Sequence, residues 1–207
     1  MPIVEIAAVA DPAEPSSWPD TPSARRAARD AIRSLELRLR AEPSATLVLE
    51  TWCVLHGLAP AGTHIVADRL TGFDKPATAE VRALLRVDRD AAVRYRRVRL
   101  RCGTLVLSQA DNWYVPGRLT AAMNAVLDNT DTPFGRVVAP LRFGRRTIAS
   151  LILWSPSLDA PARTTPLIIP AALLETRALL SMPDGTPISL VVETYSSDIL
   201  AFPPPAS

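Results

Sequence analysis

One carboxylate stands out because of the residues that precede it. Glu193 follows the apolar run from Ile188 to Val192, which is typical of a strand buried on at least one face. A carboxylate in such a place must find a partner or stay in its neutral, proton-donating form, as a general acid does. The alternative is an edge-strand glutamate that faces solvent or pairs with a structural arginine. The pattern alone leaves both interpretations open.

Arginines form the second group of interest. The segment from Arg97 to Cys102 alternates strictly, which places Arg97, Arg99 and Arg101 on one face of a strand and three apolar residues on the other. A guanidinium can hold a ligand carboxylate through two parallel hydrogen bonds. A solvated outer face has the same pattern, so the alternation does not choose between these interpretations.

A third group, from Thr130 to Arg136, combines Pro133 with Gly135. Such a segment can present free backbone N–H groups to an anion, or it can be a simple turn. The polar and aromatic segment from Asp111 to Tyr114 is expected to close the core rather than to bind a base.

Signatures of several other chemistries are missing. The sequence holds no phosphate-binding loop, no dinucleotide-binding glycine motif, no nucleophile elbow and no paired-cysteine metal motif. The histidines, His56 and His64, have no companion at a metal-ligand spacing. We therefore expect no metal and no cofactor. Any enzyme chemistry is expected to depend on Arg and Glu or Asp side chains in a sheltered pocket.

Length and composition favour a single globular domain. The chain has 207 residues, of which 48% are apolar and 21% charged, enough to bury a core without disulfides. The formal net charge is only +2, so nucleic-acid binding through bulk charge is not expected. Cys53 and Cys102 each lie in an apolar context and are expected to be buried free thiols rather than a disulfide.

The sequence shows no sign of a membrane or export segment. No apolar run reaches the roughly 18 residues of a membrane span, and the stretch from Met1 to Ala10 lacks the basic start of a signal peptide. The expectation is a cytoplasmic protein, monomeric or weakly homo-oligomeric, with a small-molecule substrate and no membrane or nucleic-acid partner.

The pattern predicts elements that would position these residues. Helices are expected over 23–41, 44–56 and 119–127, and strands over 65–66, 81–87, 93–102, 104–109, 147–154, 176–181 and 188–195, the last two forming a hairpin. Hairpin-connected strands with early helices indicate an α+β domain built on an antiparallel sheet. A proline-rich lead-in (1–22), one domain (23–202) and a frayed tail (203–207) complete the predicted organisation.

Both early helices are predicted to bury an apolar face. In the first, Arg25, Arg29, Arg33 and Arg40 are expected to face away from the stripe formed by Ala24, Ala28, Ala31, Leu35 and Leu39. In the second, which Ser44 is expected to cap and Gly57 to stop, the shared face is predicted to hold Leu47, Val48, Trp52 and Leu55.

The order of these motifs resembles the chorismate lyase (chorismate pyruvate-lyase) family from about Ser44 to Tyr195. The resemblance is carried by Ser44-Ala45-Thr46, Arg97-Val98-Arg99-Leu100, Tyr114-Val115-Pro116, Thr132-Pro133-Phe134-Gly135-Arg136, and the Asp184-Gly185-Thr186-Pro187 turn that leads to Glu193. It implies an antiparallel sheet with helices packed over it and an enclosed ligand pocket. It also implies a cofactor-independent lyase that removes pyruvate from chorismate and leaves 4-hydroxybenzoate, with ubiquinone biosynthesis as one pathway it could serve.

By motif position, the resemblance implies that Arg97 and Glu193 are catalytic and that Ala45, Phe134 and Gly135 contact the substrate through their backbone. Ala45 stands where the family often has methionine, and Phe134 replaces an aliphatic residue. Two alternatives come from other functional classes. The first is a non-catalytic module of the same fold that binds an aromatic carboxylate, and the second is a structural or partner-binding protein with a vestigial pocket.

Overall fold

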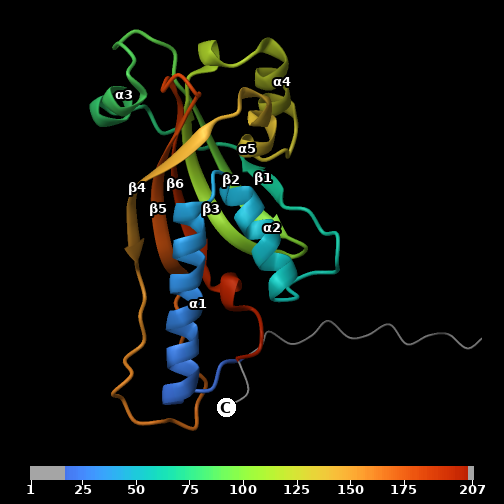
Figure 1. Cartoon of the computed structure of the whole chain (residues 1–207), viewed down its shortest axis with the longest axis vertical. Helices are drawn as coiled ribbons and strands as arrows, with labels where there is room; N and C mark the ends of the chain where they lie inside the picture. Colours follow the sequence, from blue (N-terminus) through green and yellow to red (C-terminus); the bar gives the residue numbers. More distant parts are fainter. Residues whose placement is uncertain (1–16, 205–207) are drawn as a thin grey trace, which may run out of the picture.

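A twisted antiparallel sheet forms the centre of the molecule, which is known from a computed structural model that describes residues 17–204 (Figure 1). Within those residues the sheet has 6 strands in the order β1-β2-β3-β6-β5-β4, and every neighbouring pair is antiparallel. The strands are β1 (Val66–Leu70), β2 (Arg94–Cys102), β3 (Leu105–Tyr114), β4 (Gly144–Ile152), β5 (Ala172–Ser181) and β6 (Pro187–Ser196). This architecture confirms the predicted α+β fold class with an antiparallel sheet.

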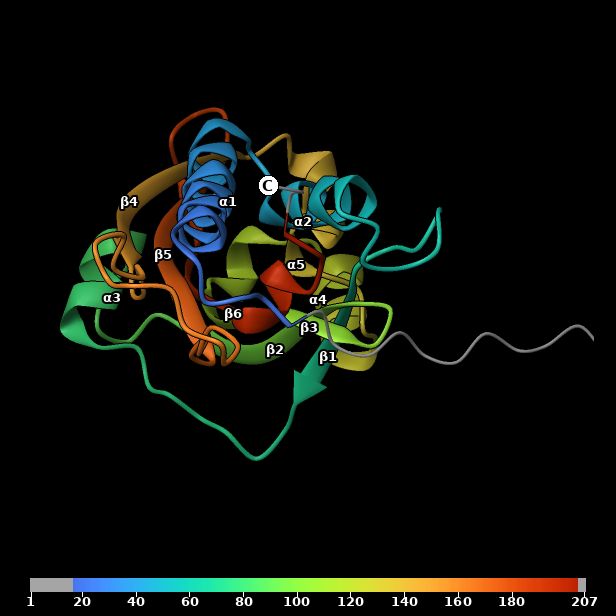
Figure 2. The same ribbon diagram turned by 90° about the horizontal axis from the view of Figure 1, so that it is seen from below.

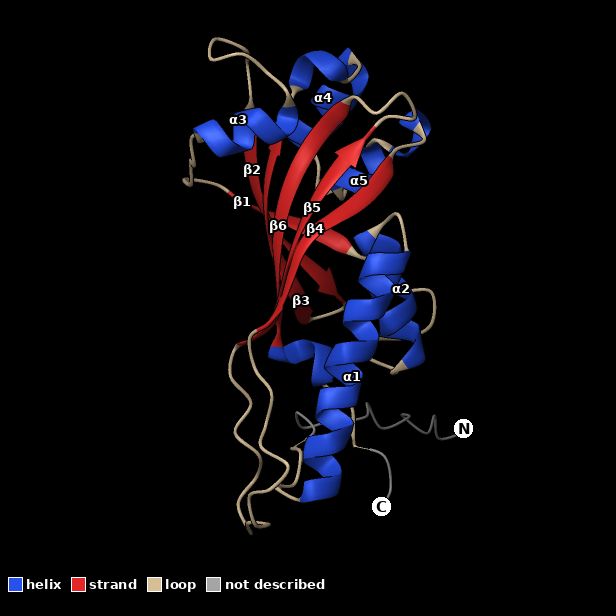
Figure 3. Ribbon diagram, turned by 60° about the vertical axis from the view of Figure 1, so that its left-hand side comes forward, coloured by secondary structure: helices blue, strands red, loops and turns tan. Residues whose placement is uncertain are grey.

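Helices cover the two faces of the sheet unequally. On the inner face, α1 (Pro22–Ala41), α2 (Ala45–Leu55), α4 (Ala121–Asn129) and α5 (Phe134–Val137) pack over strand residues such as Leu100 (Figures 2 and 3). On the outer face, α3 (Ala79–Leu85) packs against Trp113 and Leu190. Short 3-10 turns complete the elements: η1 (Pro116–Arg118), η2 (Ala139–Leu141) and η3 (Ser197–Leu200).

The first helix begins and ends where the sequence predicts, within a residue or two. The Thr21 hydroxyl caps it by accepting from the Ala24 N–H at 3.2 Å, and the extended Glu42 followed by Pro43 ends it. The predicted apolar stripe is buried except at Ala31, which is partly buried. Arg25, which was expected to face away, is buried with it and is only 3% exposed.

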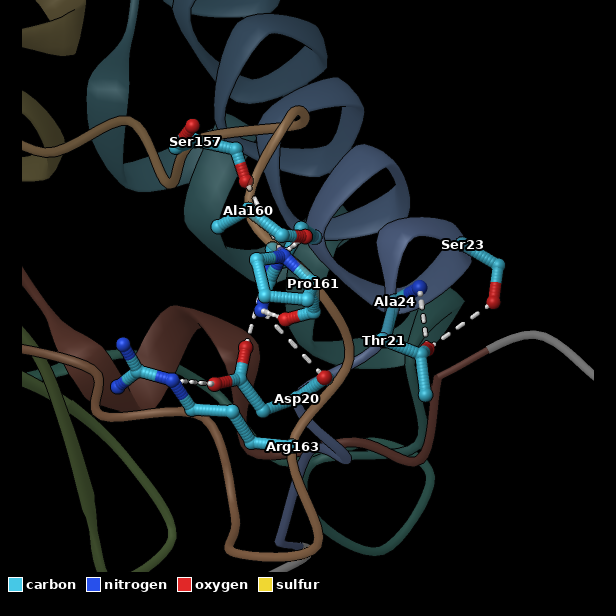
Figure 4. A network of polar contacts seen from close by, with 9 residues as sticks. Asp20, Thr21, Ser23, Ala24, Ser157, Ala160, Pro161 and Arg163 are labelled. Atoms are coloured by element: carbon cyan, nitrogen blue, oxygen red, sulfur yellow. Dashed lines mark hydrogen bonds and ion pairs between the residues drawn. The ribbon is translucent and has the colours of Figure 1, made fainter.

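The partners of Arg25 explain its burial. Its Nε donates to Asp20 at 2.6 Å, and its terminal nitrogens donate to the carbonyls of Ala160 and Pro161, the latter at 2.8 Å. These hydrogen bonds satisfy a buried cation that would otherwise be costly, and they fasten the loop of residues 153–171 to the start of α1. Figure 4 shows that loop beside Asp20, with Arg163 also approaching the Asp20 carboxylate at 3.8 Å.

The strand predicted over 81–87 is wrong, because this segment forms α3. The Thr78 hydroxyl accepts from the Val81 N–H at 3.2 Å, which begins the helix. Val81 and Leu85 then lie one turn apart and bury the same side against the outer face. A short apolar run is compatible with both helical and strand periods, and here packing against the sheet decides in favour of the helix.

The predicted hairpin near the end of the chain is confirmed, and β2 and β3 form a second one. Gly103, with φ +58°, closes β2 onto β3, and Gly185, with φ +82°, closes β5 onto β6. The strand β3 is longer than predicted and includes 111–114, where Trp113 and Tyr114 are buried, so this segment does close the core.

The second helix has the predicted cap but a different buried face. The Ser44 hydroxyl accepts from the Leu47 N–H, as expected. However, Leu47 and Leu55 are 57% and 58% exposed, whereas Leu49 and Cys53 are buried together with Val48 and Trp52. The prediction of that face was therefore wrong for its first and last members.

The two cysteines correct another prediction. Cys53 on α2 and Cys102 on β2 form a disulfide that spans 49 residues of sequence, so they are not free thiols. Both residues are buried, which places the bond inside the main core. The disulfide therefore ties the second helix directly to the inner face of the sheet.

The described part of the predicted lead-in contributes to the core. Trp18 is 1% exposed, and its indole N–H donates to the Leu200 carbonyl at 2.8 Å. The remainder of the lead-in and the end of the predicted tail, residues 1–16 and 205–207, lie outside the described residues, and the predicted domain boundaries stay predictions. None of the helices within 17–204 has the length and hydropathy needed to cross a bilayer.

Candidate functional site

A cavity lies between the inner face of the sheet and the first residues of α2 and α5. One wall is formed by Ala45 and Thr46 from α2 together with Phe134 and Gly135 from α5. The opposite wall comes from the strands, including Val98, Asn112, Arg145, Val191 and Glu193. The cavity therefore combines apolar walls with a few polar groups, as small-molecule sites do.

Glu193 lies on a central strand and points into this cavity. It is 2% exposed, and its Oε1 accepts a hydrogen bond from the Ser108 hydroxyl at 3.0 Å. Because β6 is flanked by β3 and β5, the interpretation of Glu193 as an edge-strand glutamate is wrong and that of a buried carboxylate is confirmed.

Buried polar side chains continue from Glu193 across the inner face. The row consists of Ser108 on β3, Glu193 and Tyr195 on β6, and Thr176 on β5, all of them buried, and it ends at the partly buried Arg145 on β4. Complete burial and the negative charge of Glu193 raise the pKa of the Tyr195 hydroxyl well above its ordinary value. At the far end of the row, the Arg145 guanidinium donates to the Thr176 hydroxyl at 3.3 Å.

Arg145 is the cation of the cavity. Its guanidinium also donates to the Thr147 hydroxyl at 3.0 Å and to the Leu39 carbonyl, so protein contacts hold it in place. Its Nε is buried and finds no hydrogen-bond partner within residues 17–204. A buried guanidinium N–H without a partner is costly unless a ligand or water satisfies it.

Arg97 lies on the opposite face of the sheet. It pairs in register with Asp111, with 3.5 Å between the Arg97 Nε and an Asp111 carboxylate oxygen, and its guanidinium lies 4.7 Å from the centre of the Phe73 ring. The structure thus corrects the expectation that Arg97 and Glu193 share a cavity. The alternation itself is confirmed, because Val98 and Leu100 line the cavity from the inner face.

The contacts around Arg97 have a structural role. Asp111 also accepts hydrogen bonds from the Tyr95 hydroxyl and from Lys75, and the Trp113 indole donates to the Lys75 carbonyl at 2.8 Å. Burial and the hydrogen bond to Asp111 raise the pKa of Tyr95 above its ordinary value. This network fastens residues 71–78 across the outer face.

Arg96 is the arginine of β2 that is buried on the inner face. It is 4% exposed, and its guanidinium donates to the carbonyls of Thr130 and Thr132 at 3.2 and 3.3 Å. These bonds hold the segment that leads into Phe134 and Gly135. The sequence analysis selected Arg97, the neighbour of Arg96. It did not select Arg145, because no motif surrounds that position.

The predicted backbone contacts are brought together by the fold. Ala45, Phe134 and Gly135 all line the cavity that contains Glu193. Glu50 on α2 helps to hold this wall, because it pairs with Arg136 of α5 and accepts from the Ile65 N–H at 3.1 Å. The start of α2 and the start of α5 are therefore joined at the cavity.

The cavity is small and has a larger neighbour. Its volume is about 60 Å³, and an adjoining hollow near the surface has about 230 Å³. Ser44, Thr46, Gly135 and Phe143 border both spaces. Phe143 has the largest of these side chains.

Comparison with known proteins gives one clear relative. "Uncharacterized protein y4mC" of Sinorhizobium fredii is 47% identical over 196 residues, which cover 91% of this chain and 83% of that protein. No protein-family model matches the chain.

Similarity to solved structures is weaker. PhnF from Mycobacterium smegmatis gives a TM-score of 0.49 at 15% identity, covering 84% of this chain and 80% of PhnF. The effector domain of PhnF gives 0.48 at 15% identity, covering 75% of this chain and 90% of that domain. The C-terminal domain of Yurk from Bacillus subtilis gives 0.43 at 11% identity, covering 63% and 90% respectively. All three TM-scores are below 0.5.

Proposed function

The chain belongs to the family of the Sinorhizobium fredii protein y4mC, and we propose that its inner cavity binds a small aromatic carboxylate. The observation that carries this proposal is the buried Nε of Arg145, which has no hydrogen-bond partner within residues 17–204 and belongs to a side chain that lines the cavity. A ligand carboxylate would supply the missing acceptor and would neutralise the guanidinium.

The other walls suit an aromatic ring with a polar substituent. Val98, Phe134 and Val191 offer apolar surface to the ring. The Glu193 carboxylate, which also accepts from the Ser108 hydroxyl, offers an acceptor to a hydroxyl on the ring. A ligand with one carboxylate and one hydroxyl would therefore match both polar ends of the cavity.

Size sets a condition on binding. A cavity that admits benzene has a volume of roughly 150 Å³, more than the 60 Å³ of the inner space alone. The ligand is therefore expected to displace Phe143 and to extend into the adjoining hollow. Binding that requires such a change is slower than binding to an open site.

Titration calorimetry with 4-hydroxybenzoate tests this function. We expect the wild-type protein to bind 4-hydroxybenzoate, and Arg145→Gln to weaken binding at least tenfold, since a hydrogen bond to a charged group is worth about 1.5–3 kcal/mol. Arg99→Gln is the matched control, because Arg99 is exposed on the outer face and should leave binding unchanged. 4-Hydroxybenzyl alcohol, which lacks the carboxylate, should bind no better to the wild type than to Arg145→Gln. Equal affinity of the wild type and Arg145→Gln for 4-hydroxybenzoate would contradict the proposal.

A second candidate function is the lyase reaction on chorismate, favoured by the burial of the Glu193 side chain at the same cavity. In that reaction the bond between the ring and the ether oxygen breaks, a ring proton is lost, and a proton is added to the methylene carbon of the departing enolpyruvate. Pyruvate leaves and the ring becomes aromatic. Glu193 would act as the proton donor, and Arg145 would hold a carboxylate.

Incubation with chorismate separates the two functions. Formation of 4-hydroxybenzoate and pyruvate in equal amounts, abolished by Glu193→Gln, would establish the lyase. Binding of 4-hydroxybenzoate without turnover of chorismate would leave the protein as a binding module and would rule out the lyase.

A further inference from the structure

A second hollow lies on the other side of α1, away from the inner cavity. Arg26, Arg29 and Arg33 border it from the helix, and Trp154 borders it from the segment that follows β4. Its volume is about 260 Å³. Figures 1 and 2 show α1 running alongside β4 and the beginning of that segment.

Its arginines are brought together by helical spacing. Positions 26, 29 and 33 lie three and four residues apart, so they share one face of α1. Within residues 17–204 none of these three guanidiniums makes a hydrogen bond or an ion pair. Arg25 on the same helix has five acceptor atoms, so the lack of partners at the hollow is a property of this face of the helix.

The charge at the hollow is strongly positive. Among residues 17–204, Asp30 is the one acidic residue that lines it, against three arginines, so these described residues give a local net charge of +2 by formal count. Like charges on neighbouring helix positions repel one another, so an anionic ligand that bridges them would relieve that repulsion.

An aromatic and apolar surface adjoins these charges. Trp154 is partly buried and packs against the main core, together with Ile152 of β4. The buried Ile32 of α1 completes the apolar part of the lining. An indole of this kind offers a flat surface on which a planar ring can stack.

We propose that this hollow binds a planar aromatic molecule that carries a phosphate group. The phosphate would accept hydrogen bonds from the arginine forks, whose geometry matches its oxygens, and the ring would lie against Trp154. The site is separate from the inner cavity and does not depend on the function proposed for that cavity. Nucleotides and simple aryl phosphates share this chemistry.

Titration calorimetry on the full chain tests the proposal with four probes: adenosine monophosphate, phenyl phosphate, inorganic phosphate and adenosine. At least one of the two ring phosphates should bind tenfold or more tightly than inorganic phosphate and than adenosine, because ring and charge contribute together. Binding of both ring phosphates would indicate a general aryl phosphate site, and binding of adenosine monophosphate alone would indicate a nucleotide site. Failure of both to bind would overturn the proposal.

Variants locate the binding. The double variant Arg29→Gln/Arg33→Gln should weaken the affinity for the ring phosphate that binds at least thirtyfold. Trp154→Leu should remove most of the difference in affinity between that ring phosphate and inorganic phosphate. Arg40→Gln is the matched control, because Arg40 is an exposed arginine on α1 that does not line the hollow. An equal loss in Arg40→Gln would show non-specific attraction and would contradict the site. Arg145→Gln should leave this binding unchanged, which distinguishes it from ligand binding in the inner cavity.

Discussion

Arg25, Arg96 and Arg97 are the same type of residue, but different partners satisfy their guanidinium groups. Arg25 and Arg96 are buried and donate mainly to backbone carbonyls far away in sequence. Arg97 pairs with Asp111 across a strand and stacks on Phe73. The alternation in β2 assigns Arg96 and Arg97 to opposite faces. No local pattern shows which partners satisfy each guanidinium, because any loop that passes within reach can do so.

Arg25→Ala is expected to destabilise the fold strongly. Removal of the guanidinium leaves the buried Asp20 carboxylate and the carbonyls of Ala160 and Pro161 without their main donor. The loss should be about 3 kcal/mol, measured as the free energy of unfolding in urea. Arg26→Ala, one residue away and exposed, should change it by less than about 0.5 kcal/mol. Similar values for the two variants would show that the buried contacts do not stabilise the fold.

His56 predicts a pH dependence of stability. Its ring stacks on Phe202 at 3.9 Å between ring centres, and burial together with the positive charge of Arg38 lowers its pKa below the ordinary 6.5. The folded protein therefore binds the proton less readily than the unfolded chain, so stability present above pH 6.5 decreases as the pH falls below that value.

Thermal unfolding at pH 7.5 and 5.5 measures this effect. His56→Phe keeps an aromatic ring and should show a smaller drop in melting temperature over that range than the wild type. The same drop in His56→Phe as in the wild type would contradict the assignment.

The helices and strands whose sequence patterns are long or strictly alternating form where the sequence predicts them. The stripe of α1, the alternation in β2 and the turn glycines Gly103 and Gly185 define their elements locally. The helix α3 was missed because its 7 residues carry too short a pattern to separate helix from strand. In a strand, a shift of one residue moves a side chain to the other face, and this is the difference between Arg96 and Arg97.

The disulfide is an element-scale constraint that the sequence did not reveal. Closing a loop of 49 residues is expected to stabilise the fold by roughly 4 kcal/mol, because it restricts the unfolded chain. The double variant Cys53→Ala/Cys102→Ala should therefore unfold at lower urea concentration than the wild type under oxidising conditions. Under strong reducing conditions the two proteins should become similar. Two reactive thiols in the unreduced, denatured wild type would contradict the bond.

At the scale of the whole molecule, the inner cavity is assembled from distant parts of the chain. The starts of α2 and α5 form one wall, and the inner face of the sheet forms the other. Ala45, Phe134, Gly135 and Glu193 could be foreseen as neighbours only through a family resemblance. Arg145 could not be foreseen, since its position at the cavity depends on the register in which the edge strand β4 pairs with β5.

The central claim is that this cavity, with Arg145 as its cation, binds an aromatic carboxylate. The most direct measurement is a crystal structure of the protein with 4-hydroxybenzoate. The account predicts the carboxylate within hydrogen-bond distance of the Arg145 guanidinium, the hydroxyl next to Glu193, and the Phe143 ring displaced. A ligand bound on the outer face beside Arg97, or an inner cavity that stays empty at saturating concentration, would contradict it.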